Sequence, residues 1–166
     1  MAGNFLRHND KKISLYFHRD KKNKKRISFI YFMYQSEVQI RVRYAETDQM
    51  GYVYYGNYAS YFEVARVETL RNLGFNYKTI EENGIMLPVL SYSIRYLKPA
   101  YYDELLTIKV VMKEIPMARI KFDYETYNEK DELINVADTT LVFISRKTNK
   151  PCAAPGDLIA AIKKYF

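Results

Sequence analysis

The sequence predicts an α+β fold in which a curled antiparallel β-sheet wraps around one long central α-helix. Two patterns carry this prediction: a helical apolar period between residues 58 and 73, and four long β-prone stretches that follow it. Because the connections between those stretches are short, neighbouring strands are expected to run antiparallel. One helix can cover so large a sheet only if the sheet curls around it.

A half-buried strand is predicted over residues 37–44, where the sequence EVQIRVRY alternates between apolar and polar side chains. Its apolar face is expected to hold Val38, Ile40, Val42 and Tyr44. After a loop with two glycines, the long helix is expected at 58–73, with Asn57 as its N-cap and Gly74 at its end.

The rest of the chain predicts four strands and two shorter helices. The strands are rich in Val, Ile, Tyr, Phe and Thr and are expected at 87–97, 105–115, 118–127 and 134–145. The sequence NEKDE joins the last two strands, which should therefore form an antiparallel hairpin. The two helices are expected at 76–83 and 157–164.

The positive charge is confined to one end of the chain. Residues 1–32 hold nine Lys or Arg and two Asp, a net of +7, which leaves 17 basic and 17 acidic residues in 33–166. Residues 1–32 are expected to be a disordered basic extension, and 33–166 one neutral domain. The extension is either sequence upstream of a true start at Met33 or a functional basic arm.

Several kinds of chemistry are excluded by what the sequence lacks. Both histidines, His8 and His18, lie in the extension, so the domain has none for a Ser-His-Asp triad or an ordinary zinc site. Neither a phosphate-binding Walker loop nor a dinucleotide-binding glycine motif is present. The single cysteine, Cys152, is interpreted as an inert thiol and cannot form an intramolecular disulfide, so a cytoplasmic location is expected. No apolar run approaches the roughly 20 residues that span a bilayer.

Carboxylate chemistry remains, and the loop between the first strand and the long helix is its best candidate. A helix N-terminus offers unpaired N–H groups to an oxyanion, and Asp48 lies just upstream of it. Gly51 and Gly56 permit backbone conformations and close approaches that larger residues block. The alternative is that Asp48 only stabilises its own loop as an Asx turn.

The segment VRYAETDQMGYVYYGNYASYFEVAR resembles the signature of the hotdog-fold thioesterases related to 4-hydroxybenzoyl-CoA thioesterase and the Tol-Pal-associated acyl-CoA thioesterase. The matching residues are Tyr44, Asp48, Gly51, Val53, Tyr54, Tyr55, Asn57, Tyr58, Ala65 and Arg66. A second, weaker match is Tyr96-Leu97-Lys98-Pro99-Ala100 followed by Asp103. The resemblance covers about residues 37 to 160.

The resemblance implies a hotdog fold that assembles into homodimers and often homotetramers, with active sites at the dimer interface. It places Asp48 as the catalytic carboxylate, either as nucleophile or as general base for water, and the backbone N–H of Tyr55 as the group that polarises the thioester carbonyl. The Tol-Pal-associated enzymes tend to have His at the position of Tyr55, so an imidazole-assisted mechanism is not carried over.

The same resemblance suggests which residues bind the substrate. These are Gly51, Val53, Tyr54, Asn57, Tyr58, Phe62 and Glu63. The aromatic members of this set could equally be core residues, and Glu63 could instead pair with Arg66 or Arg71.

The function expected from these observations is acyl-CoA hydrolysis to a free acid and coenzyme A, by a homo-oligomer without metal or cofactor and without nucleic-acid or membrane partners. A thiol with a pKa of about 8.5 leaves as thiolate without a strong general acid, so no histidine is required. The alternatives are an acyl carrier protein thioesterase, a hotdog protein that binds acyl-CoA without turnover, and a nucleic-acid-binding protein acting through its basic extension.

Overall fold

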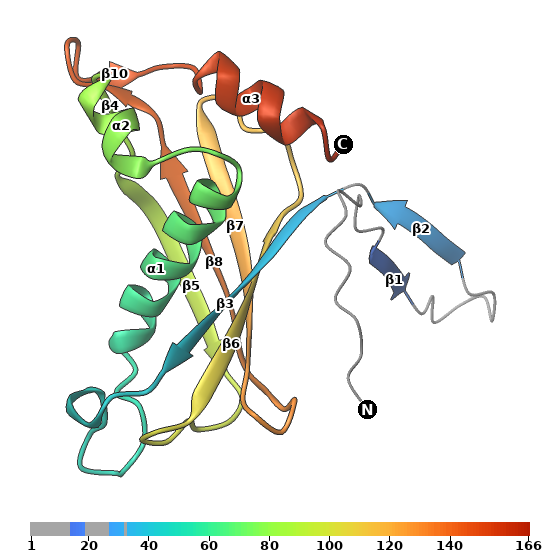
Figure 1. Cartoon of the computed structure of the whole chain (residues 1–166), viewed down its shortest axis with the longest axis vertical. Helices are drawn as coiled ribbons and strands as arrows, with labels where there is room; N and C mark the ends of the chain where they lie inside the picture. Colours follow the sequence, from blue (N-terminus) through green and yellow to red (C-terminus); the bar gives the residue numbers. More distant parts are fainter. Residues whose placement is uncertain (1–13, 19–26, 32) are drawn as a thin grey trace.

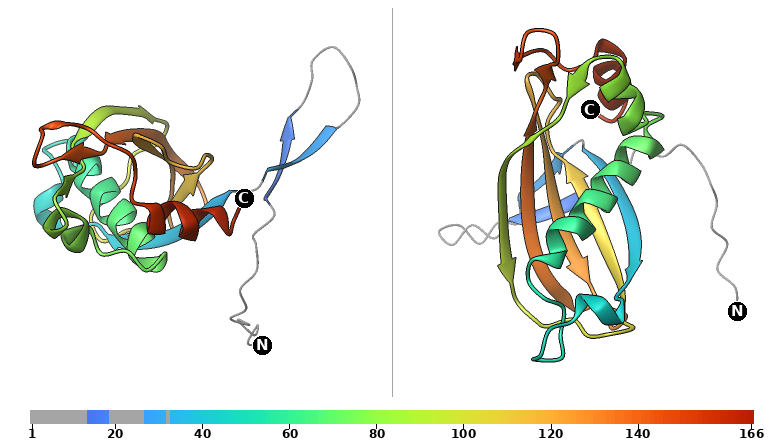
Figure 2. Two further views of the ribbon diagram at one scale, coloured as in Figure 1. Left: turned by 90° about the horizontal axis from the view of Figure 1, so that it is seen from above. Right: turned by 90° about the vertical axis from the view of Figure 1, so that its left-hand side faces the viewer.

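The computed structural model describes residues 14–18, 27–31 and 33–166, and its main body is one curled five-stranded antiparallel sheet around a helix (Figure 1). The strand order is β3-β6-β7-β8-β5. The bounds are Tyr34–Arg41 for β3, Val89–Tyr96 for β5, Leu105–Met112 for β6, Arg119–Tyr127 for β7 and Leu133–Val142 for β8. The helix α1, Asn57–Asn72, lies along the concave face of the sheet (Figure 2). The predicted α+β architecture is therefore confirmed, including the β7–β8 hairpin.

Shorter elements close one end of the body. The helices α2, Tyr77–Glu82, and α3, Gly156–Lys163, lie there with a small sheet of order β10-β9-β4 (Figure 1). Its strands are β4 at Ile85–Met86, β9 at Ile144–Ser145 and β10 at Lys150–Pro151. The loop that precedes α1 lies at the opposite end of the sheet (Figure 1).

The core lies between α1 and the concave face of the sheet. The buried residues of α1 are Tyr58, Tyr61, Phe62, Ala65, Arg66, Thr69 and Leu70, a helical stripe at spacings of three and four. The ring of Phe62 stacks on that of Tyr124 in β7, with centroids 4.5 Å apart. Burying one such side chain contributes about 1.5–3 kcal/mol. This packing fixes the position of the N-terminal end of α1 over the sheet.

The first strand of the body ends earlier than the sequence predicted. Val38, Ile40 and Val42 pack into the core as expected, but Tyr44 is 79% exposed and begins the 3-10 helix η1, Tyr44–Glu46. The side chain of Glu46 accepts a 2.7 Å hydrogen bond from the Arg43 N–H, which turns the backbone away from the sheet. The prediction that Tyr44 shares the buried face is therefore wrong.

Two strands form within the first 32 residues, for which the sequence alone predicted disorder. The strand β1, Ser14–His18, pairs antiparallel with β2, Ile27–Tyr31. Both are short runs with two aromatic residues each, and β2 adds two isoleucines; such residues favour strand pairing even beside charged sequence. The expectation for residues 1–13, 19–26 and 32 falls outside the described part of the chain.

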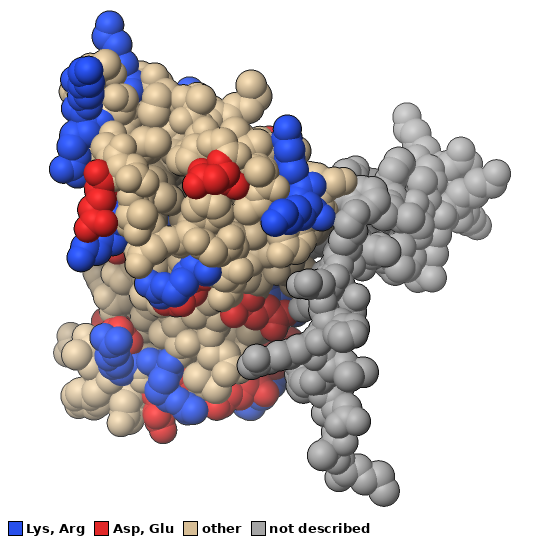
Figure 3. Space-filling model, turned by 45° about the horizontal axis from the view of Figure 1, so that its top comes forward, with Lys and Arg blue, Asp and Glu red and all other residues tan. Residues whose placement is uncertain are grey.

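The described surface carries both signs of charge side by side, with Lys and Arg interspersed among Asp and Glu (Figure 3). This mixture fits the equal numbers of basic and acidic residues in 33–166. Among the residues whose structure is described, no helix is long and apolar enough to cross a membrane.

Candidate active site

A tight turn presents Asp48 between β3 and α1. The Gly51 N–H donates to the Asp48 carbonyl oxygen at 2.9 Å, and the Asp48 N–H donates to the Tyr52 carbonyl oxygen at 3.0 Å. Gly51 has a φ of +83°, a left-handed conformation that glycine adopts without strain. The predicted need for glycine in this loop is thus met at Gly51.

The carboxylate of Asp48 makes one local hydrogen bond and keeps one oxygen available. Its Oδ1 accepts from the Met50 N–H at 2.8 Å, which is the Asx-type contact. Among the described residues no hydrogen bond reaches Oδ2, and the side chain is only half-buried. The local contact orients the carboxylate, so loop stabilisation and a chemical role are compatible.

The N-terminus of α1 presents unpaired backbone N–H groups beside this turn. Among the described hydrogen bonds, none has the backbone N–H of Tyr55 or Gly56 as donor, so both are available to an oxyanion at the positive end of the helix. Gly56 occupies the N-cap position that the sequence assigned to Asn57. The Asn57 side chain instead donates to the Glu46 carbonyl oxygen at 2.7 Å, because α1 begins one residue earlier than predicted.

The second signature segment, between β5 and β6, packs against the first. The Val53 N–H donates to the Ala100 carbonyl oxygen at 2.8 Å, and Tyr52 forms an isolated antiparallel bridge with Tyr101. Ala100 is completely buried in this contact. The two matched segments, about fifty residues apart in sequence, thus form one wall.

A hollow of about 430 Å³ lies where these segments meet. Its lining residues are Asp48, Met50, Tyr52, Val53, Tyr55, Tyr58, Tyr96, Leu97, Lys98 and Pro99. The Tyr96 hydroxyl donates to the Tyr55 carbonyl oxygen at 3.1 Å and so joins the edge strand to the start of the helix. Burial raises the pKa of Tyr58, and the neighbouring Tyr96 and Glu104 raise it further. The hollow therefore combines one carboxylate and free N–H groups with neutral aromatic walls.

The structure brings some of the predicted site residues to this hollow and not others. Asp48, Val53, Tyr55 and Tyr58 line it. Gly51 shapes the turn, Tyr54 stacks on Tyr55 and Asn57 braces the loop. Phe62 is completely buried in the core, and the Glu63 side chain is 67% exposed, with its carboxylate 3.6 Å from the Arg66 guanidinium. Glu63 thus makes the ion pair that was its alternative interpretation.

Glu46 joins the loop to α1, a contact that the sequence did not predict. Its carboxylate accepts a 2.8 Å hydrogen bond from the Tyr61 hydroxyl, and its carbonyl oxygen accepts from the Tyr54 N–H at 2.9 Å. The available signal was the spacing of three between Arg43 and Glu46, which is typical of a capping box. Because Arg43 does not look like an N-cap residue, that pattern was not recognisable.

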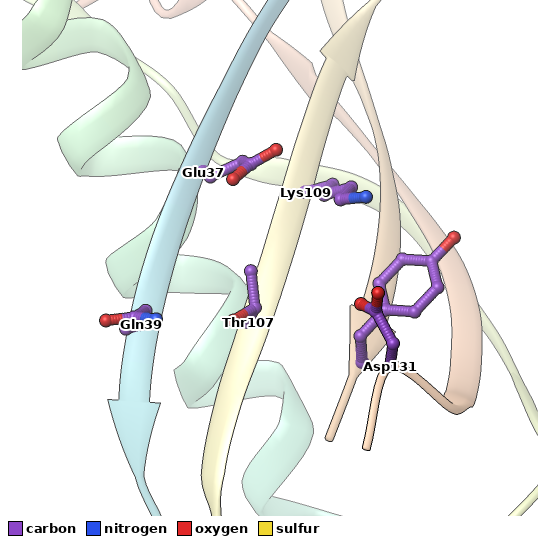
Figure 4. Close-up of a pocket in the computed structure, with 6 residues that line it drawn as sticks. Glu37, Gln39, Thr107, Lys109 and Asp131 are labelled. Carbon is purple, nitrogen blue, oxygen red and sulfur yellow. The ribbon is translucent and has the colours of Figure 1, made fainter. Parts of the chain in front are cut away.

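A second hollow, of about 530 Å³, lies on the opposite, convex face of the sheet (Figure 4). Its lining is polar: Glu37, Gln39, Thr107, Lys109, Tyr127 and Asp131. The Lys109 ammonium lies 4.5 Å from the centre of the Tyr127 ring. None of these residues belongs to the signature segments. In the part of the chain with described coordinates, no group of three or more His, Cys, Asp or Glu could hold a metal ion.

Solved structures identify the class of fold. A DHNA-CoA thioesterase from Staphylococcus aureus superposes with a TM-score of 0.75 and 38% identity, covering 78% of this chain and 89% of its own. A 4-hydroxybenzoyl-CoA thioesterase, at 23% identity and a TM-score of 0.70 over 77% of this chain and 98% of its own, shares the fold. The curled sheet around α1 is therefore the hotdog fold of these thioesterases.

Sequence comparison gives the family. The model of the thioesterase-like superfamily matches residues 42–162. A putative acyl-CoA thioesterase of Bacillus subtilis is 35% identical over 119 residues, which are 72% of this chain and 86% of the relative. An acyl-CoA thioester hydrolase of Escherichia coli is 28% identical over 75% of this chain and 93% of its own. The chain belongs to the thioesterase-like superfamily.

Proposed function

We propose that this chain hydrolyses the thioester of an acyl-CoA to the free acid and coenzyme A, with Asp48 as the reacting carboxylate. The observation that carries the assignment is the juxtaposition in one hollow of the Asp48 carboxylate and the unpaired N–H of Tyr55 at the start of α1. Relatives named as acyl-CoA thioesterases support coenzyme A, rather than acyl carrier protein, as the thiol of the substrate.

In the general-base route, Asp48 removes a proton from water while the resulting hydroxide adds to the thioester carbon. The Tyr55 N–H donates to the oxygen that becomes negative, an interaction worth about 10²–10³ in rate. The C–S bond then breaks, and the coenzyme A thiolate takes the proton from Asp48. The positive end of α1 favours the same developing charge.

In the nucleophilic route, Asp48 itself attacks the thioester carbon and expels the thiolate, and water then hydrolyses the mixed anhydride. Both routes use the same two groups and require no metal or cofactor. A single turnover in ¹⁸O-labelled water separates them, because only the nucleophilic route can leave label in the Asp48 side chain.

The test of the assignment is thiol release from a panel of acyl-CoAs, from short-chain to aromatic. Asp48→Asn keeps the side-chain oxygen that accepts from Met50 but removes the charge, so turnover should fall by at least about 10² while the fold persists. Binding of a non-hydrolysable acyl-CoA should change little, because the charge acts in the transition state. Asp131→Asn, in an exposed turn on the other face, is the matched control. If Asp48→Asn turned over substrate at the wild-type rate, Asp48 would only stabilise its own loop.

We further propose that the active form is at least a dimer, joined through the edge strand β5. Strand β5 pairs only with β8 within the described chain, and it exposes Val89, Leu90 and Tyr92. An exposed apolar edge needs cover, and pairing two copies provides it. The same edge ends at Tyr96 beside the hollow, so a partner would complete the site. A monomer with full activity in sedimentation and turnover measurements would contradict this.

The cellular location is proposed from cysteine usage. The single Cys152 is free, so the chain does not depend on an oxidising compartment, and we place it in the cytoplasm. Fractionation of cells that express the full chain tests this.

A further inference from the structure

Two buried polar side chains behind the hollow take no part in the proposed hydrolysis of the thioester. Asn135 in β8 and Thr126 in β7 are completely buried, and they face each other across the two strands. Neither amide atom of Asn135 nor the Thr126 hydroxyl has a hydrogen-bond partner among the described residues. Leaving such groups unpaired costs about 1–3 kcal/mol each. In native proteins such buried polar groups usually have a water or a ligand as hydrogen-bond partner.

The pair lies directly behind the aromatic wall of the hollow. Tyr96, which lines the hollow, is the cross-strand neighbour of Asn135 on the other side, so Thr126, Asn135 and Tyr96 form one row on the concave face. Tyr58 covers this row from α1. The Asn135 amide is close enough to the Tyr58 hydroxyl to oppose part of the rise in its pKa that burial causes, but is not placed to form a well-aligned hydrogen bond.

We propose that Asn135 and Thr126 form the polar end of the acyl pocket and select acyl groups that carry a hydroxyl or carbonyl group remote from the thioester. This inference rests on the proposed function. An amide offers both a donor and an acceptor, and the threonine hydroxyl can supply either, so the pair satisfies a substituent hydroxyl in both of its roles. The aromatic rings between the pair and Asp48 accommodate the apolar part of the acyl group.

Access to the pair depends on Tyr96. Its ring is 44% exposed on the edge strand, and its hydroxyl donates to the Tyr55 carbonyl oxygen and also interacts with the Tyr92 hydroxyl on the same strand. Displacing one such exposed side chain costs little, whereas Tyr58 is 2% exposed and fixed by its packing. Binding of the acyl group therefore moves Tyr96 and leaves Tyr58 in place.

The selectivity is measured with acyl-CoAs matched except for one hydroxyl. The pairs are benzoyl-CoA with 4-hydroxybenzoyl-CoA and hexanoyl-CoA with 6-hydroxyhexanoyl-CoA; the second pair removes any electronic effect on the thioester. The full chain should favour the hydroxylated compound of at least one pair by about tenfold or more in kcat/KM. A substrate without the hydroxyl leaves the side chains of Asn135 and Thr126 without a hydrogen-bond partner. Thioether analogues of the same compounds, measured by calorimetry, report the preference without turnover.

The variants Asn135→Leu and Thr126→Val should each bring that ratio close to one. Thr140→Val makes the same change as Thr126→Val on the opposite face of β8, where Thr140 pairs with Lys121, and should keep the ratio. If Asn135→Leu does not fold, Thr126→Val alone decides. The inference is overturned if the wild-type kcat/KM ratio is near one for both pairs of substrates, or if the ratio is unchanged in Thr126→Val. Asn135 and Thr126 would then be the partners of a buried water. Absence of thiol release with a retained binding preference would refute the proposed hydrolysis instead.

Discussion

The hydroxyl of Tyr61 on α1 donates a 2.8 Å hydrogen bond to the carboxylate of Glu46, two residues before Asp48 in the loop. The same carboxylate accepts from the Arg43 N–H at 2.7 Å. Glu46 thus links the end of β3, the loop that carries Asp48 and the helix whose N-terminus faces the hollow. We expect this link to hold Asp48 in position relative to the Tyr55 N–H.

Tyr61→Phe should weaken both stability and turnover. Because Tyr61 is 3% exposed and its partner is charged, loss of the hydrogen bond should lower the free energy of unfolding by about 1.5–3 kcal/mol. The looser loop should lower kcat by about tenfold while KM changes less, since misplacement by an ångström costs up to 10² in rate.

The matched control for Tyr61→Phe is Tyr77→Phe, which removes a 2.8 Å hydrogen bond to the Leu87 carbonyl oxygen at the other end of the body. It should lower the free energy of unfolding without changing kcat. Chemical denaturation and steady-state kinetics report the two effects, and an unchanged kcat for Tyr61→Phe would show that Glu46 does not position Asp48.

Gly51→Ala should cost about 1 kcal/mol in stability through backbone strain alone, because Gly51 has a φ of +83° and an added Cβ would meet no atom within 4 Å. Turnover should fall as well, because the turn closed by Gly51 holds Asp48. Gly74→Ala, with a φ of +89° and equally open space after α1, should carry the same stability cost and leave turnover intact. Equal turnover by Gly51→Ala and Gly74→Ala would show that the conformation of the Gly51 turn does not affect catalysis.

The sequence predicted the elements well where a single periodicity governed them. The apolar spacing of α1 and the alternation in β6 and β7 are local consequences of burial, and all three elements lie within a few residues of their predicted bounds. The end of β3 was mispredicted because a side-chain contact from Glu46, rather than the alternation itself, turns the backbone at Arg43.

The site was only partly predictable for a similar reason. Asp48 could be singled out because it precedes a helix start, and the resemblance to the thioesterase signature selected it together with Tyr55. Tyr96, Leu97 and Pro99 line the hollow because β5 pairs with β8 and its end returns to the loop. Asn135 gave no signal in sequence, since an asparagine inside a β-prone stretch reveals neither its face nor its lack of partners. Such long-range placements depend on the tertiary fold.

Removal of residues 1–32 should leave folding and hydrolysis nearly unchanged. Met33 and Tyr34 are buried and begin the body, and the signature segments all lie after them. The free energy of unfolding should stay within about 0.5 kcal/mol of the full chain.

The same truncation should also abolish any salt-sensitive retention on immobilised nucleic acid, because the removed segment carries the whole net charge of +7. Precipitation or dissociation of the truncated oligomer would instead give the segment a structural function.

The buried tyrosines should make the protein sensitive to alkali, and Tyr124→Phe should reduce this sensitivity. Burial raises the pKa of Tyr124 from 10.0 to about 12, with its hydroxyl 2.7 Å from that of Thr139. Below pH 10 the tyrosine is protonated in both states, whereas between about pH 10 and 12 the unfolded chain loses the proton first, so the free energy of unfolding falls as pH rises. The contribution of Tyr124 to this fall is at most about 2–3 kcal/mol. Urea unfolding from pH 8 to 11.5 should give a shallower slope for Tyr124→Phe than for the wild type or for Tyr102→Phe, at an exposed tyrosine; parallel slopes would show that Tyr124 does not couple folding to pH.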